Sequence, residues 1–257
     1  MEVELFNVER RRAIYELLER DKRISVADIC VAFAVSEATA RRDLAVLAAA
    51  GKIQRVRGGA VSAEASPPEL PILEREDDQA TDKERIGVAA ARLVKSGETI
   101  FLGSGTTVLA TARNLQSCRE ITVLTNSLPI INLLVGCEGI TLIVLGGILR
   151  KSELSFIGHI TEDALEEVRA DKVIIGARAI NLESGIQNDY LPETLTDRAI
   201  LKIGREVILV ADHTKFGLVS TAFLAPIDSV TTLVTDRNTK QEYIQSIREK
   251  GVEVIVA

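Results

Sequence analysis

The chain has 257 residues, 46% of them hydrophobic and 26% charged, which is typical of a globular protein with a sizeable core. It begins with a short acidic segment, and no stretch reaches the ~20 apolar residues of a membrane span. We therefore expect a cytoplasmic protein with no membrane partner. Three dispersed cysteines and two histidines predict no disulfide framework and no metal site, and we expect no cofactor.

The net charge of −6 is unevenly distributed along the chain. Residues 1–60 carry 11 basic and 9 acidic side chains, a net of +2, which leaves −8 for the remainder. A mildly basic segment ahead of an acidic body is typical of a small DNA-binding module attached to a larger domain of another kind.

Residues 7–50 predict three helices. Ile14, Leu17 and Leu18 recur at the spacing of a packed helix over residues 9–20. Ser25 and Asp28 have the pattern of a capping box, which predicts a short second helix to about residue 33. Ser36 is a good N-cap for a third helix. The side chains that this third helix is expected to bury are those of Ala40, Leu44, Leu47 and Ala48.

Residues 52–61 predict a β-hairpin, because apolar and polar residues partly alternate around the turn signal Gly58-Gly59. The following segment, 62–73, contains Pro67, Pro68 and Pro71 and is the best candidate for a linker. The sequence therefore predicts a winged helix-turn-helix domain over residues 1–61, a linker over 62–73 and a second domain over 74–257.

Helices and strands alternate in the second domain. Ile86, Ala90, Leu93 and Val94 line its first helix. Apolar, β-branched segments favour a mostly parallel sheet that is covered on both faces, so the fold class is α/β. The predicted strands are residues 99–102, 121–124, 140–145, 172–175, 206–210, 230–234 and 252–256.

The third helix and the hairpin offer a DNA-binding surface. Arg41 and Arg42 lie away from the apolar stripe of the helix, and arginine forms bidentate hydrogen bonds to guanine in the major groove. The alternative, a solvated charged face, is typical of isolated arginine pairs, but the adjoining turn and basic hairpin favour DNA binding. The predicted DNA-binding residues are Ser36, Thr39, Arg41, Arg42, Lys52, Arg55 and Arg57.

Four polar or glycine-rich clusters follow predicted strands of the second domain: residues 103–107, 125–127, 146–150 and 212–215. The carboxyl ends of parallel strands share one edge of a sheet, where ligands of α/β proteins bind. Backbone amides, hydroxyls and two cations at that edge suit a phosphate. Each cluster also has a structural alternative: Asn126 as a helix cap, Arg150 in a surface ion pair, and Asp212 bonded to Lys215.

The polar segment 176–193 lies between the third and fourth clusters and includes Asp189 and Tyr190. It offers side chains for the end of the ligand that carries no phosphate. The predicted effector-binding residues are Gly103, Ser104, Gly105, Thr106, Thr107, Thr125, Asn126, Ser127, Gly146, Gly147, Arg150, Arg178, Glu193, Asp212 and Lys215.

Both parts of the chain resemble the DeoR family of bacterial regulators. In the first part the matching segments are 35–36, 39–44 and 57–60, with Ala40 where the family usually has a β-branched residue. In the second part they are 105–107, 125–127, 146–147 and 212–215, and the family often has an aspartate near position 103 or 104. The resemblance implies a sensor domain similar in fold to ribose-5-phosphate isomerase that binds a phosphorylated sugar or related metabolite.

We therefore expect a transcriptional regulator, by resemblance a repressor of a carbohydrate catabolism operon. Its expected partners are double-stranded operator DNA, a small phosphorylated metabolite and further copies of itself, as a homodimer or homotetramer. The competing hypothesis is an isomerase-like enzyme with an accessory DNA-binding domain, in which Glu193, Asp212 and Lys215 transfer protons. A metabolite-binding scaffold without DNA function is a third possibility, but it leaves the basic hairpin unexplained.

Overall fold

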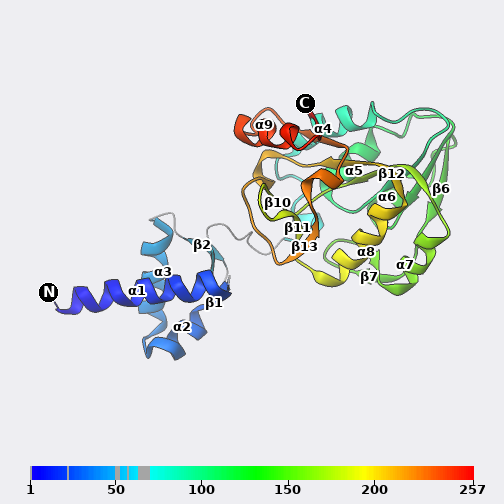
Figure 1. Cartoon of the computed structure of the whole chain (residues 1–257). Helices are drawn as coiled ribbons and strands as arrows, with labels where there is room; N and C mark the ends of the chain where they lie inside the picture. The colour runs from blue at the N-terminus through cyan, green and yellow to red at the C-terminus, as the bar shows by residue number, and fades with distance from the viewer. Residues whose placement is uncertain (1, 22, 50–52, 57, 63–69) are drawn as a thin grey trace. The chain divides into compact units, whose positions relative to one another are not determined.

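The computed structural model describes residues 2–21, 23–49, 53–56, 58–62 and 70–257 (Figure 1). The chain divides into two compact units, Met1–Glu69 and Leu70–Ala257. The last residues of the predicted linker, 70–73, lie in the second unit, where Ile72 is buried and its N–H donates to Ser152 O at 2.8 Å. No helix in the described part of the chain is long and apolar enough to cross a membrane.

The first unit contains the three predicted helices and the predicted hairpin. Its first helix is longer than predicted, and a short additional strand forms an antiparallel sheet of order β1-β3-β2 with the hairpin. The elements are α1 (Glu2–Asp21), β1 (Arg23–Ser25), α2 (Val26–Phe33), α3 (Glu37–Ala49), β2 (Ile53–Val56) and β3 (Gly59–Ser62).

Local signals explain how these elements begin and meet. The predicted capping box is present: Ser25 Oγ accepts the Asp28 N–H and Asp28 Oδ2 accepts the Ser25 N–H, both at 3.0 Å. Such a cap contributes about 1 kcal/mol. Gly59 is required where β3 meets β1, because an added Cβ would lie 2.1 Å from Ile24 O. The core of the unit includes Ile14, Leu18, Ile29, Ala40, Leu44, Leu47, Ile53 and Ala60, all buried.

The second unit is built on a seven-stranded parallel sheet of order β15-β14-β12-β9-β4-β5-β6. Two small antiparallel sheets, β7-β8 and β10-β11-β13, accompany it. The strands are β4 (Thr99–Leu102), β5 (Ile121–Thr125), β6 (Ile140–Val144), β7 (Ile148–Arg150), β8 (Ser155–Ile157), β9 (Ala170–Ile175), β10 (Ala179–Asn181), β11 (Gly185–Asn188), β12 (Gly204–Val210), β13 (Ala222–Ala225), β14 (Thr232–Thr235) and β15 (Glu253–Val256).

All seven predicted strands of the large sheet are present, and both of its faces are covered. The helices are η1 (Ile72–Glu74), α4 (Ala80–Ala91), α5 (Thr106–Arg113), α6 (Leu128–Leu134), α7 (His159–Glu166), α8 (Leu191–Ile203), η2 (His213–Lys215), η3 (Ile227–Ser229) and α9 (Gln241–Glu249). One core joins the sheet to α4, α5 and α6, and the other joins it to α7, α8, α9 and the β10-β11-β13 sheet.

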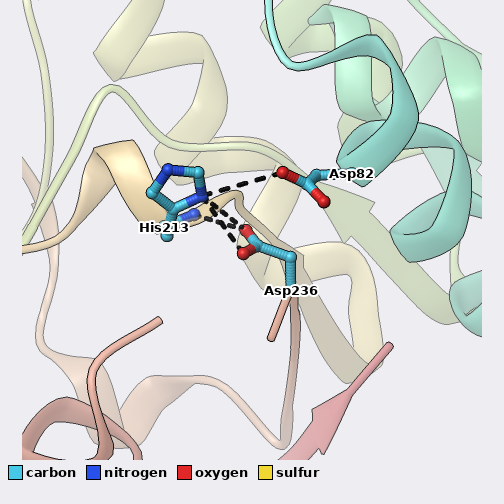
Figure 2. A group of neighbouring side chains, drawn as sticks. All are labelled: Asp82, His213 and Asp236. Atoms are coloured by element: carbon cyan, nitrogen blue, oxygen red, sulfur yellow. Dashed lines mark hydrogen bonds and ion pairs between the residues drawn. The ribbon is translucent and has the colours of Figure 1, made fainter. Parts of the chain in front are cut away.

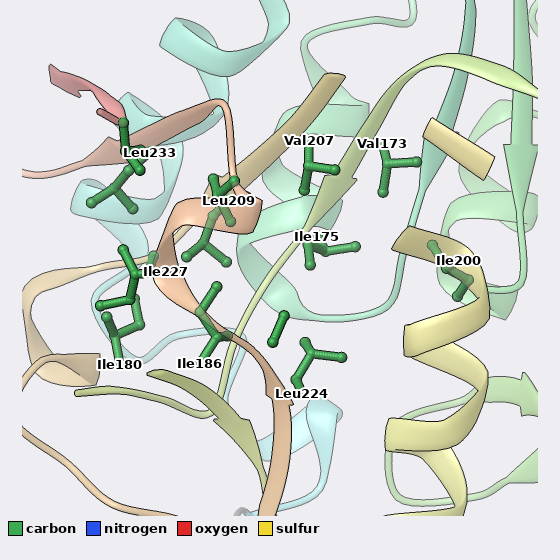
Figure 3. Packing of buried hydrophobic residues seen from close by; sticks show 14 of the residues in the cluster. Val173, Ile175, Ile180, Ile186, Ile200, Val207, Leu209, Leu224, Ile227 and Leu233 are labelled. Atoms are coloured by element: carbon green, nitrogen blue, oxygen red, sulfur yellow. The ribbon is translucent and has the colours of Figure 1, made fainter. Parts of the chain in front are cut away.

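Alternating side chains of each strand divide between these two cores. Ile174 belongs to the core on the α4–α6 side, whereas Val173 and Ile175 belong to the opposite core. Figure 3 shows Val173 and Ile175 of β9 among the side chains that join the sheet to α8 and the small sheet. Burial of one such side chain contributes about 1.5–3 kcal/mol.

The strand order has a switch point between β4 and β9. From β4 the chain continues to β5 and β6 on one side, and from β9 it continues to β12, β14 and β15 on the other. In doubly wound sheets the connections on the two sides of such a point diverge, which leaves the carboxyl ends of its two strands open to a ligand. The residues that follow β4 and β9 are therefore the expected location of a ligand.

Candidate functional site

In the first unit, α3 presents its two adjacent arginines outward. Arg41 and Arg42 are exposed, and Arg41 forms a 3.2 Å ion pair with Glu37 one turn earlier. Ser36 Oγ accepts the Thr39 N–H at 3.3 Å and lies 3.0 Å from Thr39 Oγ1, so Ser36 occupies the predicted capping position. This arrangement leaves a cationic, hydroxyl-bearing helix face on the surface, as a major-groove helix requires.

The acidic residue that follows these arginines has a different role. Asp43 is 1% exposed and accepts hydrogen bonds from Arg10 and Arg11 of α1 at 2.7 and 2.8 Å. It therefore fixes α3 against α1 while its neighbours face solvent. Of the predicted contacts in the hairpin, Lys52 and Arg57 lie outside the described residues, and only the backbone of Arg55 is described, in β2.

In the second unit, glycine residues bring the loops of the switch point together. A Cβ added to Gly176, which follows β9, would lie 3.9 Å from Ser104 O and 3.8 Å from Val210 O. The Gly103 N–H donates to Ile174 O at 3.0 Å. Consequently the loops after β4, β9 and β12 meet at one edge of the sheet, as the sequence predicts for residues 103–104 and 212–215.

The loop after β4 leads into an uncapped helix. Gly105 is the N-cap residue of α5, with φ +113°, and no side chain caps it. Thr106 and Thr107 form the first turn and are each 7% exposed. The N-terminal amides of a helix attract anions, so this turn is suited to a phosphate group.

The loop after β5 contains a buried hydrogen-bond acceptor. Asn126 Nδ2 donates to Phe156 O at 2.9 Å, but Asn126 Oδ1, also buried, has no hydrogen-bond partner among the described residues. Its neighbour Thr125 is engaged within the protein, because its Oγ1 donates to Leu102 O and accepts the Ser127 N–H. Since an unsatisfied buried acceptor costs about 1–3 kcal/mol, a ligand O–H or N–H donor at Asn126 would be stabilising.

Lys83 and Lys215 interact electrostatically near the loop that follows β12. Lys83 in the first turn of α4 is 5% exposed, and its Nζ donates to Arg75 O at 2.7 Å. Burial lowers the pKa of Lys83, Asp212 opposes this effect, and Lys215 adds to it. Asp212 caps η2, with its Oδ1 accepting the Thr214 N–H at 2.9 Å. Sequence reasoning missed Lys83, because a lysine in the first turn of a helix has no signal that distinguishes it from a solvated charge.

The predicted cation Arg150 is engaged within the protein. It forms ion pairs with Glu193 and, at 3.3 Å, with Asp189, and its guanidinium lies 4.6 Å from the centre of the Tyr190 ring. Glu193 Oε1 also accepts a 2.7 Å hydrogen bond from Ser155 Oγ. The structure thus brings Arg150, Asp189, Tyr190 and Glu193 together, with the guanidinium of the arginine paired to both carboxylates.

The carboxyl group of Asp197 interacts electrostatically with this cluster. Burial raises the pKa of Asp197 well above its ordinary value, and the nearby charge of Glu193 raises it further. Burial also raises the pKa of Glu193. Asp197 Oδ2 accepts a 2.8 Å hydrogen bond from Asn188 Nδ2.

The remaining predicted residues have mainly local contacts. Gly146 O accepts the Thr161 hydroxyl at 2.9 Å, and a Cβ at Gly147 would lie 2.1 Å from Thr161 Oγ1, so this glycine pair fits closely against α7. Arg178 follows β9, is 9% exposed, and its backbone N–H donates to Gln187 O at 3.2 Å. These contacts position the residues, and their predicted role toward an effector stays a prediction.

His213 lies beside two carboxylates (Figure 2). Its backbone N–H donates to Asp236 Oδ2 at 2.6 Å, and its Nδ1 lies 3.1 Å from Asp236 Oδ1 and 3.9 Å from Asp82 Oδ2. These three side chains could hold a metal ion. Because Asp236 already accepts backbone N–H groups from His213 and Asn238, the arrangement also fixes η2, and with it Lys215, against α4 and β14.

The two units match two family models. Residues 10–66 match the DeoR-like helix-turn-helix domain, and residues 78–237 match the DeoR C-terminal sensor domain. In fold, the chain is similar to ribose-5-phosphate isomerase A from Methanocaldococcus jannaschii, with 20% identity, a TM-score of 0.39, and coverage of 52% of this chain and 53% of that one.

Curated relatives match the chain over almost its whole length. The transcriptional repressor AccR of Agrobacterium fabrum is 33% identical and aligns with 94% of each chain. GlcR, a transcriptional repressor of Bacillus subtilis, is 32% identical over 98% of this chain and 97% of its own. The glycerol-3-phosphate regulon repressor of Escherichia coli is 31% identical over 96% and 97%.

Both family models agree with the resemblance to the DeoR family that the sequence indicates. The helix-turn-helix with its outward arginines and the parallel sheet with its loops agree with it too. These relatives are transcriptional regulators, and none of their names is that of an enzyme. The chain therefore belongs to the DeoR family of DNA-binding transcriptional regulators, with an N-terminal helix-turn-helix domain and a C-terminal sensor domain.

Proposed function

We propose that this regulator represses a carbohydrate catabolism operon and that a phosphorylated sugar, bound at the switch point between β4 and β9, controls its affinity for operator DNA. The observation that carries the proposal is the buried Oδ1 of Asn126, an acceptor with no hydrogen-bond partner among the described residues. Asn126 follows β5, which pairs with β4, the strand that leads into the uncapped N-terminus of α5. The acceptor suits a hydroxyl group and the helix N-terminus suits a phosphate, and a sugar phosphate has both.

Other features support this choice of ligand class. Lys83 and Lys215 supply positive charge near Asp212, as a phosphate site needs. Arg150, Asp189 and Glu193 form a polar cluster suited to further hydroxyl groups. One relative is named a putative aga operon transcriptional repressor, and another is named the glycerol-3-phosphate regulon repressor. Binding would regulate transcription only if the ligand binds the operator-competent arrangement with a different affinity.

The proposal includes self-association, because a two-fold dimer matches operator half-sites one helical turn or a multiple of it apart. In this proposal the ligand is bound but is not converted to a product. The competing isomerase would need Glu193, Asp212 or Lys215 to transfer protons, but Glu193 is held by Arg150 and Ser155, and Asp212 caps η2.

The test uses the purified full chain and an operator selected from a random duplex library. Glycerol 3-phosphate, ribose 5-phosphate and glucose 6-phosphate would be compared with the unphosphorylated compounds and inorganic phosphate. At least one sugar phosphate should raise the melting temperature and change operator affinity 5–150-fold at fixed salt. A ligand that binds without changing operator affinity would refute the proposed control, and isomerised product would favour the enzyme.

A matched pair of variants separates a specific site from a general effect. Asn126→Leu removes the unpartnered acceptor, whereas Asn132→Leu makes the same change at an exposed position of α6. We expect only Asn126→Leu to abolish the ligand-induced rise in melting temperature. Asn126→Ala, which also removes the acceptor and is smaller, replaces the leucine variant if that variant does not fold.

A further inference from the structure

The two edges of the large sheet differ in charge. At one edge, β15 carries the exposed Glu253 and follows Lys250. At the other edge, β6 lies within residues 139–149, eleven consecutive residues without a charged side chain. Exposed edge strands of monomers are usually protected by charge or proline, because their free backbone groups pair readily with another strand. The β6 edge lacks this protection.

Exposed aliphatic side chains surround the β6 edge. Ile143 and Val144 of β6, Ile148 and Leu149 of β7, and Ile160 of α7 are 38–59% exposed. We call these five residues the edge face. They are a third of the fifteen large exposed hydrophobic residues in the described part of the chain. Figure 1 shows β6 as the outermost strand on its side of the unit.

Ile143 and Val144 are consecutive in β6, so they flank its edge on opposite faces of the sheet, and α7 and β7 lie beside them. A Cβ at Gly158, two residues before Ile160, would lie 3.4 Å from the Ile148 side chain. Thr161 Oγ1 donates to Gly146 O, in the short connection between β6 and β7. The start of α7 therefore lies directly beside β7 and the end of β6. Exposed apolar side chains gathered around an edge strand mark an interaction site.

We propose that the edge face is the interface between two copies of this chain, with the two β6 strands paired antiparallel across a two-fold axis. Identical antiparallel strands are self-complementary, since each supplies the donors and acceptors that the other needs. Residues 139–149 carry no charge, so two β6 strands can pair along their length without like-charge repulsion. The pairing would join two seven-stranded sheets into one continuous sheet.

This proposal rests on the self-association proposed above but not on the identity of the effector, and its test needs no ligand. Sedimentation velocity of the full chain would be measured over a hundredfold range of concentration for the wild type, Ile143→Lys and Ile160→Lys. Each lysine places an unpaired charge in the interface, so we expect the dimer dissociation constant to rise at least tenfold. If the wild type is a tetramer, each variant should stop at a smaller assembly.

Val135→Lys is the matched control. Val135 is 74% exposed at the end of α6, outside the edge face, and its substitution should leave the assembly unchanged. Circular dichroism establishes that each variant is folded, and Ile143→Thr, which is uncharged and suited to a strand, replaces any lysine variant that is not. A wild type that is monomeric throughout, or folded edge-face variants that assemble as the wild type does, would overturn the proposal.

Discussion

Arg10 Nε donates to Asp43 Oδ2 at 2.7 Å, and this contact joins α1 to the helix whose neighbouring arginines are proposed to bind DNA. Arg11 Nε occupies the other carboxylate oxygen at 2.8 Å. In the run Arg41-Arg42-Asp43, two adjacent cations thus face solvent and the anion faces inward. The position of the proposed recognition surface therefore depends on a buried carboxylate that does not itself face DNA.

Asp43→Ala should lower the free energy of unfolding of the first unit by about 2 kcal/mol, because hydrogen bonds to charged groups contribute ~1.5–3 kcal/mol. Chemical denaturation followed by circular dichroism measures the change. Glu16→Ala is the control: Glu16 pairs with Arg12 on the exposed surface of α1, and such pairs contribute less than about 1 kcal/mol. Equal losses from the two substitutions would contradict the structural role of Asp43.

Arg42→Ala should weaken operator binding by about 1–3 kcal/mol if its guanidinium reads a base. The measurement is a gel-shift titration at fixed salt with the selected operator and with scrambled DNA of the same length. Arg12→Ala removes an exposed arginine from α1 and serves as the control for net charge. Equal weakening by the two variants on both DNAs would mean that Arg42 contributes only general electrostatic attraction.

Lys83→Met should weaken the binding of the most stabilising sugar phosphate about tenfold, which corresponds to ~1.4 kcal/mol. Methionine keeps the length of the apolar stem and removes the buried charge that lies near Asp212 and Lys215. Isothermal titration calorimetry measures the affinity, and Lys95→Met, at an exposed position after α4, is the matched control. Wild-type affinity in Lys83→Met would remove this lysine from the proposed site.

Asp197→Asn should flatten the dependence of stability on pH. Because the pKa of Asp197 is raised in the folded protein, the folded state holds a proton that the unfolded state releases. The free energy of unfolding should therefore fall as the pH rises from about 4 through the raised pKa. Asparagine does not titrate, so the melting temperature of the variant should increase relative to the wild type over this range.

The same melting curves for Asp163→Asn provide the comparison, since Asp163 is exposed on α7. Parallel curves for Asp197→Asn and the wild type would show that Asp197 does not titrate differently in the folded and unfolded states.

Much of the fold could be predicted because the relevant signals are local. The spacing of Ile14 and Leu18 predicts α1, and the capping pattern at Ser25 predicts α2. β1 was not predicted, since its three residues include one apolar side chain, Ile24, and become a strand only where β3 lies beside them. The strands β7 and β8 are equally short and likewise depend on each other for pairing.

The candidate site was less predictable, because its electrostatics depend on distant segments. Arg150 was predicted as a cation for the ligand, but its ion pairs come from Asp189 and Glu193, 39 and 43 residues away. Nothing near Lys83 in the sequence indicates that its side chain is buried. Sequence patterns identified the loops, whereas the charge balance between them required the folded sheet.

The order of the two units along the chain also determines the order in which they are synthesised. The elements of the first unit end at Ser62, whereas the loops proposed to bind the effector continue to Lys215. The ribosome therefore completes the residues that are predicted to contact DNA before it reaches Lys215, the last residue predicted to bind the effector. A nonsense mutation between these points would encode a product with the complete DNA-binding segment and without Lys215. The proposed control by an effector thus requires a longer stretch of intact coding sequence than the proposed DNA contacts do.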